Sequence, residues 1–490
     1  MSLLERVDAW GLSDSDRPAH VSRHGRLTYG ELTRRADAVA AHLARALPED
    51  RAPVAVLGHK EPEVLIAFLG ALRAGRAYVP IDTVTPAQRV GRVVTAAAAP
   101  VMLTPESVAA ITEEAGAAPR RDLGPDDPFY IMFTSGSTGD PKGVVITLGC
   151  LTSYLDWLLA EQNFEEGEHF LNVVPYSFDV SVMDTYAALA TGGTIYSVTR
   201  EDVANPRQLY PFLADAGLTT WVSTPSFAQM CLVERSFSAE LLPRLRRFLF
   251  CGETLAPEVA ARLLDRFPAA QVWNTYGPTE TTVAVTSLRI DRDMLARWSP
   301  LPIGRPMPGS RVVVVDEADR PVPDGKRGQI VIAGPSVSPG YLGRPDLTER
   351  GFFRLGGLRA YRTGDWGRYR DGLLFFEGRM DGQIKLHGYR IELADVEANL
   401  RALPGVRDAV VLPVLKQGAA DSLAAFVILN ERPAGSDFQA AAALRSQLAE
   451  RLPAYMLPRK VHFLETFPMN ANGKADRRRL AEVLATKQAG

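Results

Sequence analysis

A run of hydroxyl-bearing and glycine residues, TSGSTGDPKG, occupies positions 134–143 and has the composition of an anion-binding loop. Its four hydroxyl groups and several backbone N–H groups are hydrogen-bond donors, and small glycines let the backbone approach an anion closely. Lys142 adds a positive charge. The run is not a Walker loop, Gly-x-x-x-x-Gly-Lys-Ser/Thr, because Gly143 follows the lysine. It therefore indicates another kind of phosphate-binding loop, although a serine- and glycine-rich surface turn has a similar composition.

The elements that would position this loop are two strands. Residues 130–133 and 144–146 are apolar, and the second segment is β-branched, so the loop is expected to join them. Before the loop, a strand at 53–57 is followed by a helix at 61–74, and this alternation continues along the chain. The pattern predicts a parallel α/β organisation.

Three later apolar segments, at 221–223, 248–250 and 272–276, each end in small or polar residues. The carboxyl ends of parallel strands meet at one edge of a sheet, where ligand crevices form. Tyr276 offers an aromatic face for a base, and Glu280 offers a hard oxygen for Mg²⁺. Either residue alone is more often structural, but both lie in the run NTYGPTE.

Asp179 lies among aromatic and apolar residues, in the run YSFDVSV. The residues after it are expected to form a helix, so its carboxylate could be a helix N-cap. Alternatively, it is a partly desolvated carboxylate that holds the ammonium group of a substrate, an interaction that low dielectric strengthens.

From Ile303 onward the composition favours β structure, which predicts a small barrel-like subdomain. Asp365 could bind two ribose hydroxyls with its two oxygens. Beyond Asp381 a new pattern of strands and helices begins, so the chain is expected to divide into domains at 1–380 and 381–490. Lys474 lies in a Gly/Asn loop, where a lysine is usually only solvated.

The bulk composition excludes several classes of protein. The chain has 490 residues, too many for one ordinary core, and its 46% apolar and 23% charged residues are normal for a globular protein. A net charge of −2 gives no reason to expect a nucleic-acid partner. Three dispersed cysteines without CxxC, and no HExxH, indicate neither a disulfide framework nor a zinc site. No signal peptide or membrane-spanning run is evident, so we expect a cytoplasmic protein that does not insert into a membrane.

The loop TSGSTGDPKG resembles the signature loop of the adenylate-forming superfamily, and the runs LTYGEL, NTYGPTE and YRTGD resemble further motifs of amino-acid adenylation domains, in order. More narrowly, SFDVSVMDTYAAL, TTWVSTPSFAQMCL and FLFCGETL are similar to the D-alanine–carrier protein ligases. The resemblance covers essentially the whole chain. It implies an α/β fold with two α/β subdomains and a small β-barrel in a large N-terminal domain, and a small mobile α+β C-terminal domain.

The resemblance also implies a two-step reaction. An amino-acid carboxylate first attacks the α-phosphate of ATP, with Mg²⁺ at Glu280, and the thiol of a phosphopantetheine group then attacks the aminoacyl-adenylate. No LGGxS-type attachment serine follows, so the acyl or peptidyl carrier protein is expected to act in trans. Lys474 would be the catalytic cation, Asp381 the hinge, and Gly388 part of the thiol tunnel. The phosphate-binding residues would be Thr134, Ser135, Gly136, Ser137, Thr138, Gly139 and Lys142. The nucleotide-binding residues would be Gly252, Glu253, Asn274, Thr275, Tyr276, Gly277, Thr279, Asp365 and Arg379.

The resemblance places the amino acid among Asp179, Cys251, Gly277 and Val283. Cys251 and Val283 match positions that wall a small pocket, which favours alanine, and Cys251 matches a cysteine associated with a preference for D-alanine. Cys251 could also be only a small buried apolar residue. The alternatives are an L-alanine or glycine ligase in natural-product (nonribosomal peptide or polyketide) assembly, an acyl-CoA ligase, which would not need Asp179, and an adenylate-binding scaffold without turnover.

Overall fold

The computed structural model describes residues 1–47, 51–112, 120–135, 140–380, 383–386, 389–416, 419–431, 436–469 and 475–489. The chain divides into two compact units. The first unit comprises Met1–Thr83, Val94–Phe133 and Gly143–Met380, and the second comprises Val84–Val93, Thr134–Lys142 and Asp381–Gly490. Among the described residues no helix is long and apolar enough to cross a membrane.

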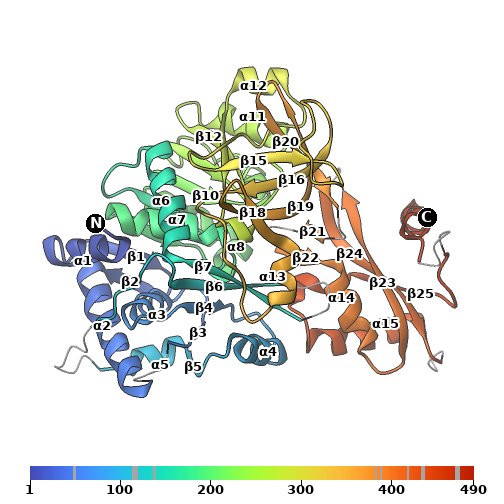
Figure 1. The fold of residues 1–490 in the computed structure, drawn as a ribbon, viewed down its shortest axis with the longest axis horizontal. Coiled ribbons are helices and arrows are strands. Elements are labelled where there is room, and N and C mark those ends of the chain that lie inside the picture. Colours follow the sequence, from blue (N-terminus) through green and yellow to red (C-terminus); the bar gives the residue numbers. More distant parts are fainter. Residues whose placement is uncertain are drawn as a thin grey trace. The chain divides into compact units, whose positions relative to one another are not determined.

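The larger sheet of the first unit is mainly parallel. Within the described part of the chain its nine strands have the order β14-β13-β12-β11-β10-β8-β9-β1-β2, and the run from β12 to β1 is parallel. Figure 1 labels β1, β2, β10 and β12 of this sheet. Antiparallel strands complete both edges. The strands are β1 (Pro18–Ser22), β2 (Gly25–Thr28), β8 (His169–Asn172), β9 (Thr194–Ser197), β10 (Thr220–Ser223), β11 (Arg247–Phe250), β12 (Gln271–Tyr276), β13 (Thr286–Ile290) and β14 (Arg305–Pro306).

A second α/β sheet of the first unit has six strands in the described residues, in the order β17-β7-β6-β4-β3-β5. β5, β3, β4 and β6 pair in parallel. The strands are β3 (Val54–Leu57), β4 (Tyr78–Ile81), β5 (Val101–Leu103), β6 (Pro128–Thr134), β7 (Lys142–Thr147) and β17 (Gly340–Tyr341). Strands β6 and β7 are the two that the sequence predicts on either side of the phosphate loop.

The β-rich segment after Ile303 forms an antiparallel sheet, which is five-stranded in the part that the structure describes. Its order is β15-β16-β19-β18, and β20 pairs with β19. The strands are β15 (Arg311–Val315), β16 (Gly328–Ala333), β18 (Phe352–Leu355), β19 (Leu358–Arg370) and β20 (Leu373–Arg379). Alternate residues of β15 and β16 are buried in one apolar cluster, as the period of two in a strand requires.

Helices cover the α/β sheets and begin at recognisable signals. α2, for example, begins at a capping box in which Thr28 and Glu31 satisfy each other's backbone N–H groups. The helices of the first unit are α1 (Leu3–Ser13), α2 (Tyr29–Ala46), α3 (Pro62–Arg73), α5 (Pro105–Ala109), α6 (Leu148–Gln162), α7 (Val180–Thr191), α8 (Arg200–Ala204), α9 (Pro206–Asp215), α10 (Pro225–Cys231), α11 (Pro257–Arg266), η1 (Thr279–Thr281), α12 (Arg292–Arg297) and α13 (Pro345–Gly351). α4 (Ala87–Ala97) crosses the division between the units.

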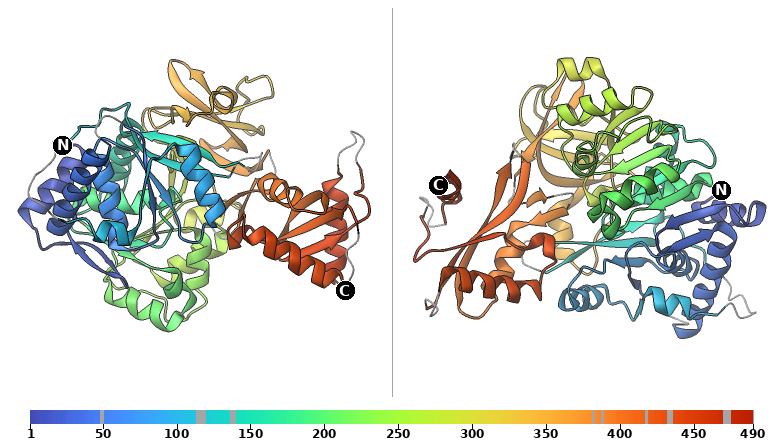
Figure 2. Two further views of the ribbon diagram at one scale, coloured as in Figure 1. Left: turned by 90° about the horizontal axis from the view of Figure 1, so that it is seen from below. Right: turned by 180° about the vertical axis from the view of Figure 1, so that it is seen from behind.

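The second unit has an α+β core of its own, coloured orange to red in Figure 2. Alternate residues of β23 and β24 face two apolar clusters, one shared with α14 and α15 and the other with α16. The helices therefore lie on both faces of this pair of strands. The elements are β21 (Gln383–Leu386), β22 (Tyr389–Glu392), α14 (Leu393–Arg401), β23 (Val406–Lys416), β24 (Ala419–Leu429), α15 (Asp437–Ala449), η2 (Ala454–Met456), β25 (Lys460–Phe463) and α16 (Arg477–Ala489).

Candidate active site

The candidate site of the first unit lies where β8, β10, β11 and β12 end. These strands are parallel and in register, so their carboxyl ends meet at the same edge of the sheet. Asp179 follows β8, Cys251 follows β11 directly, and Gly277 follows β12 directly. The strand-end argument from the sequence therefore applies to Cys251 and Gly277, and the structure adds the segment that leads from β8 to Asp179.

Asp179 occupies the N-cap position of α7, but its side chain makes no capping hydrogen bond. Its negative charge instead contributes to the pKa values of two tyrosines, Tyr130 on β6 and Tyr154 on α6. Burial first, and the charge of Asp179 next, raise the pKa of Tyr130 well above its ordinary value. For Tyr154 the same shift in pKa comes from burial, then from Cys251 and Asp179. Both hydroxyls are buried without a hydrogen-bond partner in the part of the chain that the structure describes. Two neutral hydroxyls thus lie within electrostatic range of Asp179.

The loops after β11 and β12 contact each other and α7. The thiol of Cys251 donates to the carbonyl oxygen of Val283, at 3.6 Å from Sγ to O. A Cβ added to Gly277 would lie 2.6 Å from Cα of Ala284, so only glycine allows this approach. A Cβ on Gly252 would lie 3.4 Å from Cγ2 of Val180, the residue after Asp179. The structure thus brings Cys251, Gly277 and Val283 into contact, and Val180, the residue after Asp179, packs against Gly252.

The wall opposite Cys251 has a strained backbone. Thr282 and Val283 have φ of 64° and 65°, the left-handed region that β-branched residues rarely adopt. Each such residue costs about 1–3 kcal/mol, and such strain is concentrated at functional sites. In this backbone conformation the carbonyl oxygen of Val283 points toward the thiol of Cys251.

The predicted nucleoside subsite contains a buried carboxylate with two partners. The hydroxyl of Tyr276 donates to Oδ2 of Asp365 at 2.5 Å, and Nη1 of Arg379 donates to Oδ1 at 2.6 Å. Each carboxylate oxygen retains a second lone pair, so Asp365 can still accept hydrogen bonds from ribose hydroxyls. The ring of Tyr276 also lies 6.2 Å from that of Phe376, measured between centroids.

Other residues predicted to bind the nucleotide make hydrogen bonds within the protein. Nδ2 of Asn274 donates to the carbonyl oxygen of Pro302 at 2.9 Å, and Oγ1 of Thr275 donates to that of Phe250 at 2.8 Å. Oε2 of Glu253 accepts from the backbone N–H of Ser226 at 3.0 Å. Thr279 begins the short helix η1. The side chains of Asn274 and Thr275 therefore fix the end of β12.

Glu280 is buried, and a phenol orients its carboxylate. The hydroxyl of Tyr341 donates to Oε1 of Glu280 at 2.8 Å, and it lies 3.2 Å from the hydroxyl of Tyr361. Burial first, and Glu280 next, raise the pKa of Tyr341, so this phenol stays a neutral donor. Among the described residues no group of three or more His, Cys, Asp and Glu side chains could hold a metal ion. A single oriented carboxylate fits Mg²⁺ held jointly with nucleotide phosphates.

Several predicted residues lie outside the described residues: Gly136, Ser137, Thr138, Gly139, Asp381, Gly388 and Lys474. Of the phosphate loop, Thr134 ends β6, Ser135 is buried, and Lys142 begins β7. Tyr130, Tyr154 and Tyr341 were not predicted as site residues. Tyr130 and Tyr154 occupy apolar positions of a strand and a helix, so only the three-dimensional structure shows that the charge of Asp179 raises the pKa of both.

The chain is similar to known enzymes over nearly its whole length. Residues 7–342 match the family model described as AMP-binding enzyme, and residues 395–474 match its C-terminal domain. D-alanine–D-alanyl carrier protein ligases of Bacillus thuringiensis (strain Al Hakam) and Bacillus mycoides (strain KBAB4) are 44% identical, over 99% of this chain and 100% of theirs.

Solved structures share the fold. The adenylation domain AlmE of Vibrio cholerae, in complex with glycyl-adenosine-5′-phosphate, has a TM-score of 0.83 at 23% identity, over 99% of this chain and 97% of that one. Holo-PA1221, a nonribosomal peptide synthetase protein with adenylation and PCP domains, has a TM-score of 0.82 at 27% identity, over 98% and 84%. The predicted α/β fold is thus confirmed, and the chain belongs to the AMP-binding enzyme family, as an AMP-forming ligase.

Proposed function

We propose that this protein uses ATP to adenylate a small amino acid and transfers the aminoacyl group to the phosphopantetheine thiol of a separate carrier protein. The observation that carries the proposal is Asp179, a carboxylate at a helix start that does not cap its helix. The next residue, Val180, packs against Gly252, which follows Cys251. The identity of 44% to D-alanine–D-alanyl carrier protein ligases over their whole length supports it. We place the reaction in the cytoplasm, where ATP is available.

In the first step, a carboxylate oxygen of the amino acid attacks the α-phosphorus of ATP. The bond from this phosphorus to the bridging oxygen breaks, and pyrophosphate leaves with the electron pair. Catalysis of phosphoryl transfer is mainly positioning and electrostatic stabilisation. Asp179 holds the ammonium group, Tyr276 and Asp365 hold the nucleoside, and Lys474 stabilises charge on the α-phosphate. The loop 134–142 binds the outer phosphates.

In the second step, the carrier thiol loses its proton to water, and its sulfur attacks the acyl carbon of the aminoacyl-adenylate. The bond from this carbon to the phosphate oxygen breaks, AMP leaves with the electron pair, and a thioester forms. We propose that the C-terminal domain, 381–490, turns about Asp381 between the steps, since few residues at the end of an element suffice for a hinge. This turn withdraws Lys474 and brings Gly388 to the thiol tunnel.

We propose alanine as the amino acid, because with the ammonium and carboxylate groups held at fixed positions only the α-substituent could vary. Cys251 and Val283 would admit only a small substituent, and contact of the Cys251 sulfur with an L-methyl group would favour D-alanine. A methyl misfit contributes only about 1–3 kcal/mol, so L-alanine or glycine in natural-product assembly is the second candidate. An acyl-CoA ligase is disfavoured because it has no use for Asp179.

The proposal is tested by ATP–pyrophosphate exchange with D-alanine, L-alanine, glycine and serine, and with a fatty acid as control. We expect exchange with alanine, and a preference for D- over L-alanine of about 10-fold, within the range of a methyl misfit. A preference for L-alanine or glycine would refute the stereochemical assignment alone. Exchange with the fatty acid and none of the amino acids would refute the function.

A second test addresses Mg²⁺, which would neutralise charge on the phosphates. The variant Glu280→Gln keeps the shape and the acceptor oxygen for Tyr341 but removes the charge. We expect the Mg²⁺ concentration for half-maximal exchange to rise by about ten-fold or more, as for loss of one charged ligand contact of about 1.5–3 kcal/mol. A conservative change in the same cluster, Tyr361→Phe, should leave it nearly unchanged. An unaltered Mg²⁺ requirement in Glu280→Gln would refute the metal assignment.

A further inference from the structure

A buried lysine of the first unit has no role in the reaction described above. Lys60 lies between β3 and α3, and its side chain is completely buried. Nζ donates to Oδ1 of Asn172 and, at 2.6 Å, to the carbonyl oxygen of Val174. It also lies 4.2 Å from the centre of the Tyr176 ring. An ammonium group is rarely buried unless it is paired. Here Asn172, Val174 and the ring of Tyr176 surround the ammonium group of Lys60.

Asn172 connects this lysine to a buried carboxylate on α7. Nδ2 of Asn172 donates to Oδ1 of Asp184 at 2.9 Å, and the hydroxyl of Ser197 donates to Oδ1 of Asn172 at 2.8 Å. Burial lowers the pKa of Lys60, and the charge of Asp184 opposes that shift. Burial likewise raises the pKa of Asp184, and Lys60 opposes it. The two charges therefore stabilise each other in the interior.

The positions of these partners along the chain relate them to the amino-acid site. Val174 lies five residues before Asp179, and Asp184 lies five residues after it. Asn172 and Ser197 end β8 and β9, at the same edge of the sheet as the candidate site. Lys60 thus holds both flanks of the segment that carries Asp179.

We propose that Lys60 is a positioning residue for the amino-acid site, which fixes segment 174–184 so that Asp179 meets the substrate ammonium group. This inference rests on the proposed function. A carboxylate displaced by about 1 Å from its working position can lower activity by about 10²-fold. Loss of the tether should therefore weaken amino-acid binding more than ATP binding.

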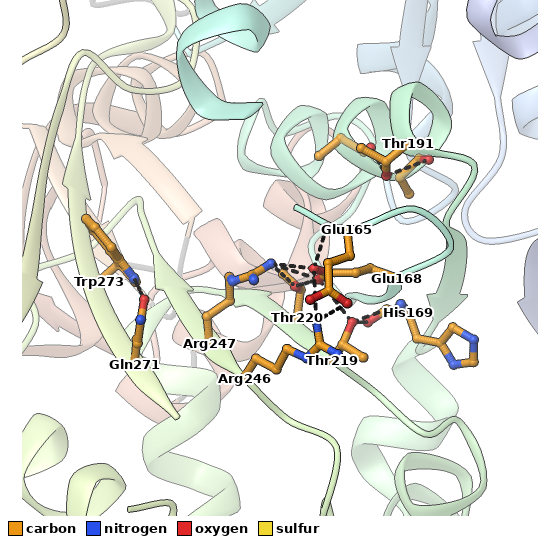
Figure 3. A network of polar contacts seen from close by, with 12 residues as sticks. Glu165, Glu168, His169, Thr191, Thr219, Thr220, Arg246, Arg247, Gln271 and Trp273 are labelled. Atoms are coloured by element: carbon orange, nitrogen blue, oxygen red, sulfur yellow. Dashed lines mark hydrogen bonds and ion pairs between the residues drawn. The ribbon is translucent and has the colours of Figure 1, made fainter. Parts of the chain in front are cut away.

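A matched control lies in the same sheet, at the amino ends of the strands. Nη1 of Arg247 donates to both oxygens of Glu168, at 2.9 and 2.8 Å, and the hydroxyl of Thr220 donates to Oε2 at 2.7 Å (Figure 3). Glu168 directly precedes β8, whereas Asn172 ends it. This buried pair is comparable in charge and burial but lies at the amino ends of the strands.

The test compares two double variants, Lys60→Met with Asp184→Asn and Arg247→Met with Glu168→Gln. Each removes both charges, so no unpaired charge stays buried. We expect the first to raise the KM for alanine in ATP–pyrophosphate exchange by about 10- to 100-fold while the KM for ATP changes by less than about two-fold. The second should change neither, although both lower the unfolding temperature. Equal alanine KM values in the two variants would overturn the proposal.

A further double variant, Lys60→Gln with Asp184→Asn, keeps the test decisive if the first does not fold, and it too leaves no unpaired charge buried. Its shorter, neutral amide cannot replace the ammonium group on Asn172 and Val174, so its KM for alanine should rise above the wild-type value. A wild-type KM for alanine in this variant would refute the proposal. Absence of exchange in the wild-type enzyme would instead refute the proposed function, so the two failures are distinguishable.

Discussion

Replacement of Lys474 by alanine is expected to slow amino-acid-dependent pyrophosphate release by about 10²–10³-fold, the usual effect of removing a donor from developing charge. The ammonium group would bridge the substrate carboxylate and the α-phosphate, whose charges increase in the transition state. It would contribute little to the ground-state complex, so the Kd for ATP should hardly change. Single-turnover pyrophosphate release and equilibrium ATP binding measure the two quantities separately.

Lys460 provides the control for this prediction. It begins β25 of the second unit and is exposed. Lys460→Ala removes the same charge from the same part of the chain and should leave both quantities at their wild-type values. Near-normal pyrophosphate release in Lys474→Ala would refute the catalytic assignment. An equally large loss of ATP affinity would show that the lysine stabilises the ground-state complex with ATP instead.

Replacement of Asp179 by alanine is expected to raise the KM for the amino acid by roughly 30-fold to several thousand-fold, with little change in the KM for ATP. Removal of one partner of a buried charge pair costs about 2–5 kcal/mol, and each 1.4 kcal/mol is ten-fold in affinity. The substrate ammonium group would be left in the interior without its counter-charge. Amino-acid and ATP titrations of the exchange reaction give the two values.

Asp179→Asn separates this role from helix capping. Asparagine is as good an N-cap as aspartate, so a capping role predicts near wild-type behaviour for this variant. An ammonium-binding role predicts a loss close to that of Asp179→Ala, because the charge is gone. Equal losses of amino-acid and ATP affinity in both variants would indicate damage to α7 rather than to the pocket.

Much of the architecture follows from local signals in the sequence. The apolar runs on either side of the phosphate loop are β6 and β7, and the runs that end at Ser223, Phe250 and Tyr276 are β10, β11 and β12. Such runs are short and bounded by turn residues, which makes their type clear from sequence. Two terminal helices, α1 and α16, were not predicted. α16 begins with three arginines, so its apolar face is weak.

The candidate site was predictable only where residues share a motif. Cys251, Gly277 and Val283 lie in short runs, and the structure brings them into contact. The pair of Lys60 and Asp184 joins residues more than a hundred positions apart. In the sequence alone, neither residue can be distinguished from a solvent-exposed lysine or aspartate; only the fold shows that both are buried. Long-range pairing of this kind has no local signal in a single sequence.

The hydrogen bond from Tyr276 to Asp365 has a thermodynamic consequence. It joins β12 of the large sheet to β19 of the antiparallel sheet, so a nucleoside held by both residues, as proposed, would bind only while the two sheets are together. Ligand binding would then add to the free energy of local unfolding of the antiparallel sheet, by about 2.7 kcal/mol at a concentration of 100 Kd. The bound nucleotide would thus hold the two sheets together, and the antiparallel sheet would unfold locally least often when the enzyme is saturated with nucleotide.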